Sequence, residues 1–151
     1  MSPEKDKYLC ETYPKLFRDR HAPMTETAMC WGFDCDDGWF NIIDKLCANI
    51  QHHIDWREEQ RAREVKRGQN GESGMPRTPH VSQVVVTQVK EKFGTLRFYY
   101  TGGDEYISGL VSMAESMSGV TCETCGVPGT QRKDGWIRTL CDEHAKKYEQ
   151  V

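Results

Sequence analysis

Three cysteines and a histidine near the C-terminus constrain the fold of this 151-residue chain more than any other feature. Cys122 and Cys125 are separated by two residues, and Cys141 and His144 repeat that spacing after a loop of 15 residues. Two such pairs can meet around one tetrahedral zinc ion, which binds thiolate sulfur and imidazole nitrogen. Gly126 suits the tight turn in which backbone amides point at a thiolate. The spacing therefore predicts a zinc module over residues 122–151.

The predicted zinc ion has a structural role. Four protein ligands complete its coordination sphere and leave no position for a reactive water. The alternative is a set of unconnected buried thiols and a surface histidine, but four donors at matching spacing argue against it. The motif therefore explains how the C-terminal end folds, and the function has to be sought elsewhere in the chain.

The composition describes a soluble protein with a modest core. Hydrophobic residues make up 37% of the chain, and the net charge is −3, so no overall basic field points to nucleic acid. The sequence shows no signal peptide and no apolar run of membrane-spanning length, so we expect no membrane partner. These features predict a protein of the reducing cytoplasm, with free thiols at Cys10, Cys30, Cys35 and Cys47.

Residues 1–121 are expected to form one α+β domain. A short helix is predicted over Tyr13–Arg18, and a longer one begins near Trp39, with Asp36 or Asp37 as its cap. Apolar side chains recur at helical spacing along the longer helix, at Trp39, Ile42, Ile43, Leu46, Cys47 and Ile50. Asp44, on the same helix, is expected to be solvated.

A β-hairpin and a second helix follow. Val84–Val89 and Leu96–Tyr100 predict two strands, joined by residues 90–94. Residues 107–117 carry an apolar stripe, and Gly119 is the expected end of that helix. This order predicts an α+β fold with two main helices on one face of a small antiparallel sheet, followed by the zinc module.

Residues 57–80 are polar and form a predicted insertion. Six basic and four acidic residues alternate with hardly any apolar side chain, and the second half is rich in glycine. The first half could extend the preceding helix as a solvated rod, whose mixed charges suggest ion pairs on an exposed face. It could also fold onto a partner.

The loop of the zinc module combines cations with an aromatic side chain: Arg132, Lys133, Trp136 and Arg138. Such a set suits a protein interface, in which Trp and Arg are frequent anchors. It suits phosphate contact with base stacking equally well. The structural alternative is that Trp136 packs the module against the second helix, which leaves the basic residues solvated.

A possible phosphate site lies at the turn Gly102–Gly103, between a strand and a helix N-terminus. Lys90, Lys92 and Arg97 could add positive charge from the hairpin. The simpler interpretation is a Gly-Gly turn that reverses the chain, since Asp104 next to it would oppose an anion.

Two other groups of residues contain side chains that can ligate a metal or act in catalysis. Cys30, Cys35 and Cys47 with His52 or His53 could suggest a second metal, but the irregular spacing favours buried thiols. Acidic residues at 34, 36, 37 and 44 do not accompany a nucleophile and base, so no catalytic residue is predicted.

Distinctive segments are spread over most of the chain outside residues 57–80: Tyr13–Phe17 (YPKLF), Trp31–Phe33 (WGF), Asp37–Trp39 (DGW), Val89–Phe98 (VKEKFGTLRF), Glu115, Cys122–Gly126 (CETCG), Gly135–Trp136 and Thr139–Cys141. As a set they resemble an uncharacterised family of small zinc-binding proteins encoded by phages and prophages. The resemblance implies a phage accessory protein working inside a bacterial host, and it brings no activity with it.

The leading hypothesis is therefore a binding protein that engages a host protein and blocks a host defence system. Its contacts would come from Trp136, Arg132, Arg138 and the 57–80 segment. A protein that binds or sequesters a nucleotide or nucleic acid is the alternative, using Lys90, Lys92, Arg97 and the Gly102–Gly103 turn. A hydrolase-type enzyme comes third.

Overall fold

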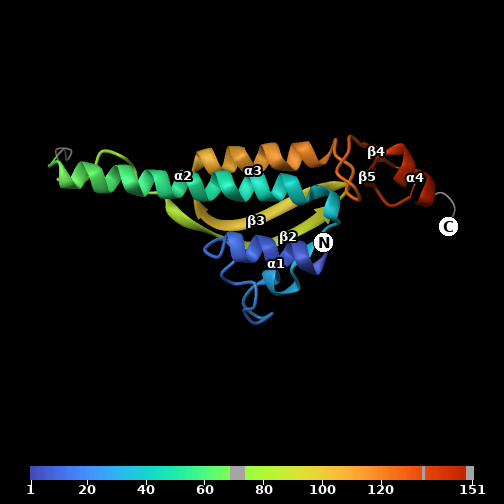
Figure 1. The fold of residues 1–151 in the computed structure, drawn as a ribbon, viewed down its shortest axis with the longest axis horizontal. Helices are drawn as coiled ribbons and strands as arrows, with labels where there is room; N and C mark the ends of the chain where they lie inside the picture. Colours follow the sequence, from blue (N-terminus) through green and yellow to red (C-terminus); the bar gives the residue numbers. More distant parts are fainter. Residues whose placement is uncertain (69–73, 134, 149–151) are drawn as a thin grey trace.

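The computed structural model describes residues 1–68, 74–133 and 135–148 and confirms the predicted α+β class. Helices pack on a small mixed sheet, and a second, two-stranded sheet belongs to the C-terminal module (Figure 1). The elements in chain order are α1 (Pro3–Thr12), η1 (Ala28–Trp31), β1 (Phe33–Asp34), η2 (Asp37–Trp39), α2 (Phe40–Lys66), β2 (Ser82–Lys92), β3 (Thr95–Gly103), α3 (Glu105–Ser118), β4 (Thr130–Arg132), β5 (Arg138–Leu140) and α4 (Asp142–Tyr148).

The central hairpin is longer than the sequence suggested. β2 and β3 pair antiparallel as far as Lys92 and Thr95, so the connection is the two-residue turn Phe93–Gly94 rather than residues 90–94. Both turn residues have positive φ, 53° and 76°, as in the turns whose twist matches that of the flanking strands. β1 adds to β2 in parallel, with Phe33 opposite Val89, and this makes the sheet mixed.

The predicted long helix is confirmed as α2, whose 27 residues span about 40 Å. Its apolar face is buried at Ile43, Leu46, Ile50 and Ile54. The predicted acidic cap is wrong, because Trp39 occupies the N-cap position and no side chain caps the helix. Asp37 instead accepts a hydrogen bond of 2.6 Å from the backbone amide of Ser2.

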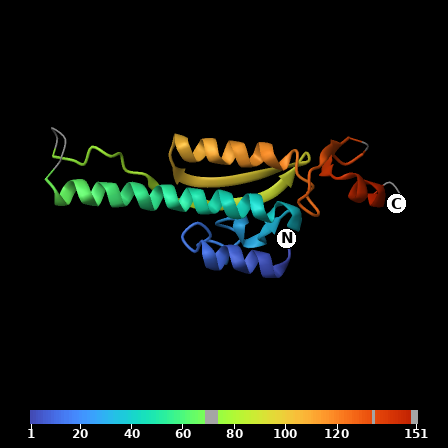
Figure 2. The same ribbon diagram turned by 45° about the horizontal axis from the view of Figure 1, so that its top comes forward.

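The first part of the predicted insertion continues α2 as a helix that projects beyond the sheet (Figures 1 and 2). Residues 69–73 lie outside the described part of the chain. After them the chain contacts the helix again: Glu64 accepts hydrogen bonds from the backbone amide and the hydroxyl of Thr78, and Arg61 donates to the Thr78 carbonyl. These bonds attach the returning chain, at Thr78, to the projecting end of α2.

The N-terminal helix lies earlier than predicted. α1 ends at Thr12, because Pro14 disfavours a helical conformation at Tyr13, the residue before it. Residues 14–20 then form turns. The Tyr13 hydroxyl donates 2.7 Å to the Asp44 carboxylate, so Asp44 is buried in a contact between the N-terminal segment and α2. The expectation of a solvated Asp44 is therefore wrong.

The second main helix, α3, runs beside α2 and along the outer edge of β3 (Figures 1 and 2). Asp104 caps it by accepting a hydrogen bond from the Ile107 amide. Along the strand, the Leu96 amide donates 2.8 Å to the Ser118 hydroxyl, and the Phe98 amide donates 3.0 Å to Glu115. α3 thereby covers backbone groups that would otherwise form an open sheet edge.

One hydrophobic core joins the N-terminal segment, the hairpin and both main helices. Its largest fully buried side chains include Trp39, Ile43, Ile50, Leu96 and Ile107. None of the helices in the described residues has the length and apolar character needed to cross a membrane.

Candidate metal centre and adjoining groove

The four predicted metal ligands come together in space. The ligand atoms of Cys122, Cys125, Cys141 and His144 all lie within 4.8 Å of one another. Two sulfur atoms, those of Cys125 and Cys141, are 3.9 Å apart, and His144 Nδ1 is 3.2 Å from the Cys141 sulfur and 3.7 Å from the Cys122 sulfur. A tetrahedron with metal–sulfur bonds of about 2.3 Å has edges of roughly 3.8 Å, so the cluster could hold one metal ion.

The turn after Cys122 supports a thiolate, as the sequence predicted. The Gly126 amide donates 2.8 Å to the Cys122 carbonyl, and Gly126 adopts φ +84°. Burial acts to raise the pKa of Cys122, but amides of Cys141, Cys125 and Thr124 donate to its sulfur and bring that pKa down to about 6. Amides that stabilise the charged sulfur also favour its bonding to a cation.

The metal cluster is attached to the rest of the fold at two points. The Trp39 indole donates 2.9 Å to the Thr121 carbonyl, and the Gly38 amide donates 2.7 Å to the Glu123 carbonyl. At the hairpin turn, the Thr139 hydroxyl of β5 donates 2.5 Å to the Gly94 carbonyl. The module is thus held against both the start of α2 and the end of the hairpin.

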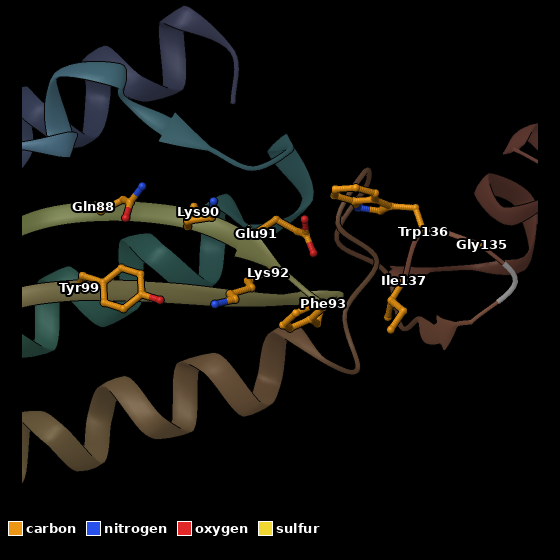
Figure 3. A pocket seen from close by; sticks show the side chains of 9 residues that line it. All are labelled: Gln88, Lys90, Glu91, Lys92, Phe93, Tyr99, Gly135, Trp136 and Ile137. Atoms are coloured by element: carbon orange, nitrogen blue, oxygen red, sulfur yellow. The ribbon is translucent and has the colours of Figure 1, made fainter. Parts of the chain in front are cut away.

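Trp136 does not pack the module against α3, because 78% of the residue is exposed. It borders a groove of about 580 Å³ between the loop of the module and the hairpin (Figure 3). Phe93 and Tyr99, which are 64% and 42% exposed, line the same groove. Its other lining residues are Gln88, Lys90, Glu91, Lys92, Gly135 and Ile137. Three exposed aromatic rings therefore line this groove.

Phe93 occupies an unusual backbone conformation. Among the described residues it is the one non-glycine residue with positive φ, at 53°. Side chains with a Cβ pay a free-energy penalty there, and Asn and Gly are the usual choices in such a turn. The ring gains little burial in return, although the Lys92 ammonium lies 5.5 Å from its centre. Stability alone does not explain a phenylalanine at this position.

A second hollow of about 460 Å³ adjoins the groove and shares Lys90, Glu91 and Trp136 with it. Its floor includes Glu123, which is only 3% exposed. The Asp36 amide donates 3.2 Å to one carboxylate oxygen of Glu123, and the other oxygen has no hydrogen-bond partner. Burial raises the pKa of Glu123, and the charge of Asp36 raises it further.

The basic residues of the module loop have different roles from one another. Arg132 donates 2.5 Å to Asp142 and also reaches the Leu140 carbonyl, so it braces β4 against α4. Arg138 donates 3.0 Å to Asp36. Its guanidinium also lies 4.4 Å from the centre of the Tyr148 ring. Lys133 is exposed. Of the four predicted contact residues, Trp136 and Lys133 are thus the ones that project into solvent.

The residues of the predicted phosphate site are divided between the two ends of the hairpin. Lys90 pairs with Arg97 in the register, whereas Gly103 pairs with Ser82 at the opposite end. Gly102 is needed for a close approach, because a Cβ there would lie 2.3 Å from the Gln83 carbonyl oxygen. The N-terminus of α3 already has the Asp104 carboxylate as its cap, so the structure does not bring the cations and the glycines together.

Lys90 and Lys92 lie instead in the groove beside Phe93 and Trp136 (Figure 3). The sequence assigned these lysines and Trp136 to two separate candidate sites. The groove unites them because the hairpin turn docks on β5, a contact between residues that are 45 positions apart. No local pattern in the sequence announces such a contact.

The remaining cysteines are isolated thiols. In the described parts of the chain, only the four C-terminal residues form a potential metal cluster, and Cys10, Cys30, Cys35 and Cys47 are all free. Burial raises the pKa of Cys10 and of Cys35 to about 12. Cys35 and Cys47 are buried, as expected, whereas Cys30 is only partly buried, so the prediction of a buried thiol is wrong for Cys30.

No protein-family model, curated protein or solved structure matches this sequence.

Proposed function

We propose that the C-terminal cluster binds one zinc ion and that this ion is structural. Three sulfurs and one imidazole nitrogen form the donor set that zinc prefers over harder cations, which favour oxygen. All four donors come from the protein, which matches closed structural sites. The metal would hold the loop from Cys122 to Cys141 against the hairpin turn and so fix one wall of the groove.

The protein as a whole, we propose, acts by binding another protein through the groove between the hairpin and the metal module. The observation that carries this proposal is the exposure of Trp136, Phe93 and Tyr99 around this groove. Exposed aromatic rings that cluster at a concave surface are typical anchors of protein interfaces. Phe93 strengthens the case, because it retains an exposed ring at a strained turn position.

The context implied by the phage-family resemblance makes a bacterial host protein the proposed partner, and a component of host defence the proposed target. A binding role fits the site better than catalysis does. In the described residues, the groove contains no nucleophile paired with a base and an orienting group. The metal ligands are likewise used to build the module.

A nucleotide or nucleic-acid ligand is the second candidate, and one observation favours it. Lys90 and Lys92 lie in the same groove as Phe93 and Trp136, which would allow phosphate contact together with base stacking. The carboxylates of Glu91 and of the adjoining hollow oppose such a ligand, because they would repel phosphate. The protein partner is therefore the stronger proposal.

Affinity capture from bacterial host lysate tests the choice. The wild type, Trp136→Ala and the control Trp56→Ala are compared before and after nuclease treatment. Trp56 lies on α2 outside the groove and is also exposed. We expect one stoichiometric protein that survives nuclease, is lost with Trp136→Ala and remains with Trp56→Ala. The purified pair should then show at least a hundredfold weaker affinity for Trp136→Ala, since central aromatic anchors carry much of the binding energy.

Two outcomes would contradict the proposal. A partner retained equally by Trp136→Ala would remove the groove from the interface. A complex that disappears on nuclease treatment and weakens steeply with salt would point to nucleic acid instead. Thermal stabilisation by a nucleotide, lost in Lys90→Ala and Lys92→Ala, would support the second candidate.

A further inference from the structure

The hollow beside the groove carries an excess of negative charge. Four carboxylates line it, those of Asp34, Asp36, Glu91 and Glu123. Its positive groups are Lys90, Arg138 and the amino group of Met1, which donates to the carbonyls of Phe33 and Cys35. The carboxylates of the hollow therefore outnumber its positive groups by one.

Glu123 is the buried member of this group. Its side chain is 4% exposed, and the Arg138 guanidinium lies 3.6 Å from the oxygen that lacks a hydrogen bond. That separation is too long for a hydrogen bond. Arg138 makes its close contact, at 3.0 Å, with Asp36 instead. Arg138 therefore divides its charge between two carboxylates. A second cation in the hollow would offset the part of the desolvation cost of Glu123 that Arg138 leaves uncompensated.

The rim of the hollow offers two carboxylates for direct contact. In the described parts of the chain, no Lys, Arg or His side chain lies within ion-pair distance of Asp34 or Glu91. Glu91 uses one oxygen to accept from the Gly94 amide, and its other oxygen is available. Trp136 stands between the hollow and the groove and lines both.

We propose that this hollow binds the guanidinium group of an arginine from the protein partner that occupies the adjoining groove. The inference rests on the proposed protein-binding function and names the chemistry of the partner segment. A guanidinium presents several donors in a planar fork that matches carboxylates, and it stacks on an indole face. Asp34 and Glu91 accept from it at the rim, and the buried charge of Glu123 attracts it from below.

The probe for this site is N-acetyl-arginine amide, with N-acetyl-citrulline amide as the neutral control of nearly the same shape. Each is titrated into the full-length, metal-loaded protein, and the amide and indole N–H signals are followed by NMR. We expect saturable shifts at Trp136, Glu91 and Glu123 for the arginine compound, with a dissociation constant on the order of millimolar for so small a ligand. The citrulline compound should leave these signals unchanged.

Variants identify the residues responsible. Glu123→Gln removes the buried charge but keeps an oxygen to accept from the Asp36 amide, and it should weaken arginine binding roughly tenfold. Glu91→Gln is the second variant, with the same direction of effect, and covers the case in which Glu123→Gln fails to fold. Glu105→Gln removes the same formal charge on the exposed first turn of α3 and should bind as the wild type does.

Equal shifts with the citrulline compound would overturn the inference, as would unchanged arginine affinity in a folded Glu123→Gln or Glu91→Gln variant. Rejection of the arginine site can be distinguished from failure of the proposed protein-binding function. A captured partner that depends on Trp136 but not on Glu91 or Glu123 keeps the binding function and rejects the arginine site. The amide titration needs no captured partner, so it remains decisive if none is found.

Discussion

The indole nitrogen of Trp39 donates a 2.9 Å hydrogen bond to the carbonyl oxygen of Thr121, next to the first metal ligand. Trp39 is fully buried in the main core, so one side chain serves both the core and the entry to the metal module. Trp39→Phe keeps most of the apolar surface but leaves this carbonyl without its donor. We expect the free energy of unfolding to fall by about 1–3 kcal/mol, measured by urea denaturation. Trp56→Phe, at an exposed position, should change it by less than about 0.5 kcal/mol.

Removal of one metal ligand should unfold the C-terminal module. Cys125→Ser is expected to lower the zinc content from one ion per chain to a small fraction, because the hydroxyl is a much weaker ligand than a thiolate. Amide signals from residues 122–148 should lose dispersion, and a strong chelator should produce the same change in the wild type. Cys30→Ser, outside the cluster, should retain one zinc ion. An unchanged NMR spectrum after complete metal removal would refute the structural role.

Glu115 holds the edge of β3 through the Phe98 amide, at 3.0 Å. Glu115→Ala leaves this backbone donor without its partner, and we expect a loss of about 1–3 kcal/mol in the free energy of unfolding. Hydrogen exchange of the Phe98 amide should accelerate by more than that of the Leu96 amide, which keeps its bond to Ser118. Glu105→Ala, on the exposed first turn of the same helix, is the matched control. Equal exchange rates in the two variants would show that the side chain does not protect the edge.

Phe93 should show a trade-off between stability and binding. Phe93→Asn places a residue that tolerates positive φ in the hairpin turn, and the free energy of unfolding should rise by roughly 1 kcal/mol. The same change removes an exposed ring from the groove and should weaken capture of the protein partner. Phe93→Tyr should keep both properties of the wild type. A Phe93→Asn protein that is more stable and binds equally well would leave the strained phenylalanine without a function.

The elements that could be predicted are those whose signals are local. The helical period of the apolar residues after Trp39 identifies α2, and the alternation from Leu96 to Tyr100 identifies β3. The clustering of the four potential metal ligands follows from their spacing alone. The cap of α2 could not be predicted in this way, because Asp37 is used by the Ser2 amide, far away in sequence.

The groove escaped prediction for the same physical reason. Trp136 is exposed because the module is anchored by other residues, among them Thr139 at the hairpin turn and Trp39 at the start of α2. The sequence left both an exposed and a packed Trp136 open, because burial depends on which surfaces meet. Only the docked arrangement shows that Lys90, Lys92 and Trp136 line the same groove (Figure 3).

Gly38 brings two stretches of backbone into direct contact: a Cβ at this position would lie 2.2 Å from the Cys122 carbonyl oxygen. No larger residue fits without separating the start of α2 from the metal turn. The proposed metal binding and closure of this contact would therefore be linked equilibria, each favouring the other by the same free energy. The affinity for the proposed ion would accordingly depend on how well the distant core is folded. A larger residue at Gly38 should lower the metal content of the protein, even though Gly38 supplies no ligand to the ion.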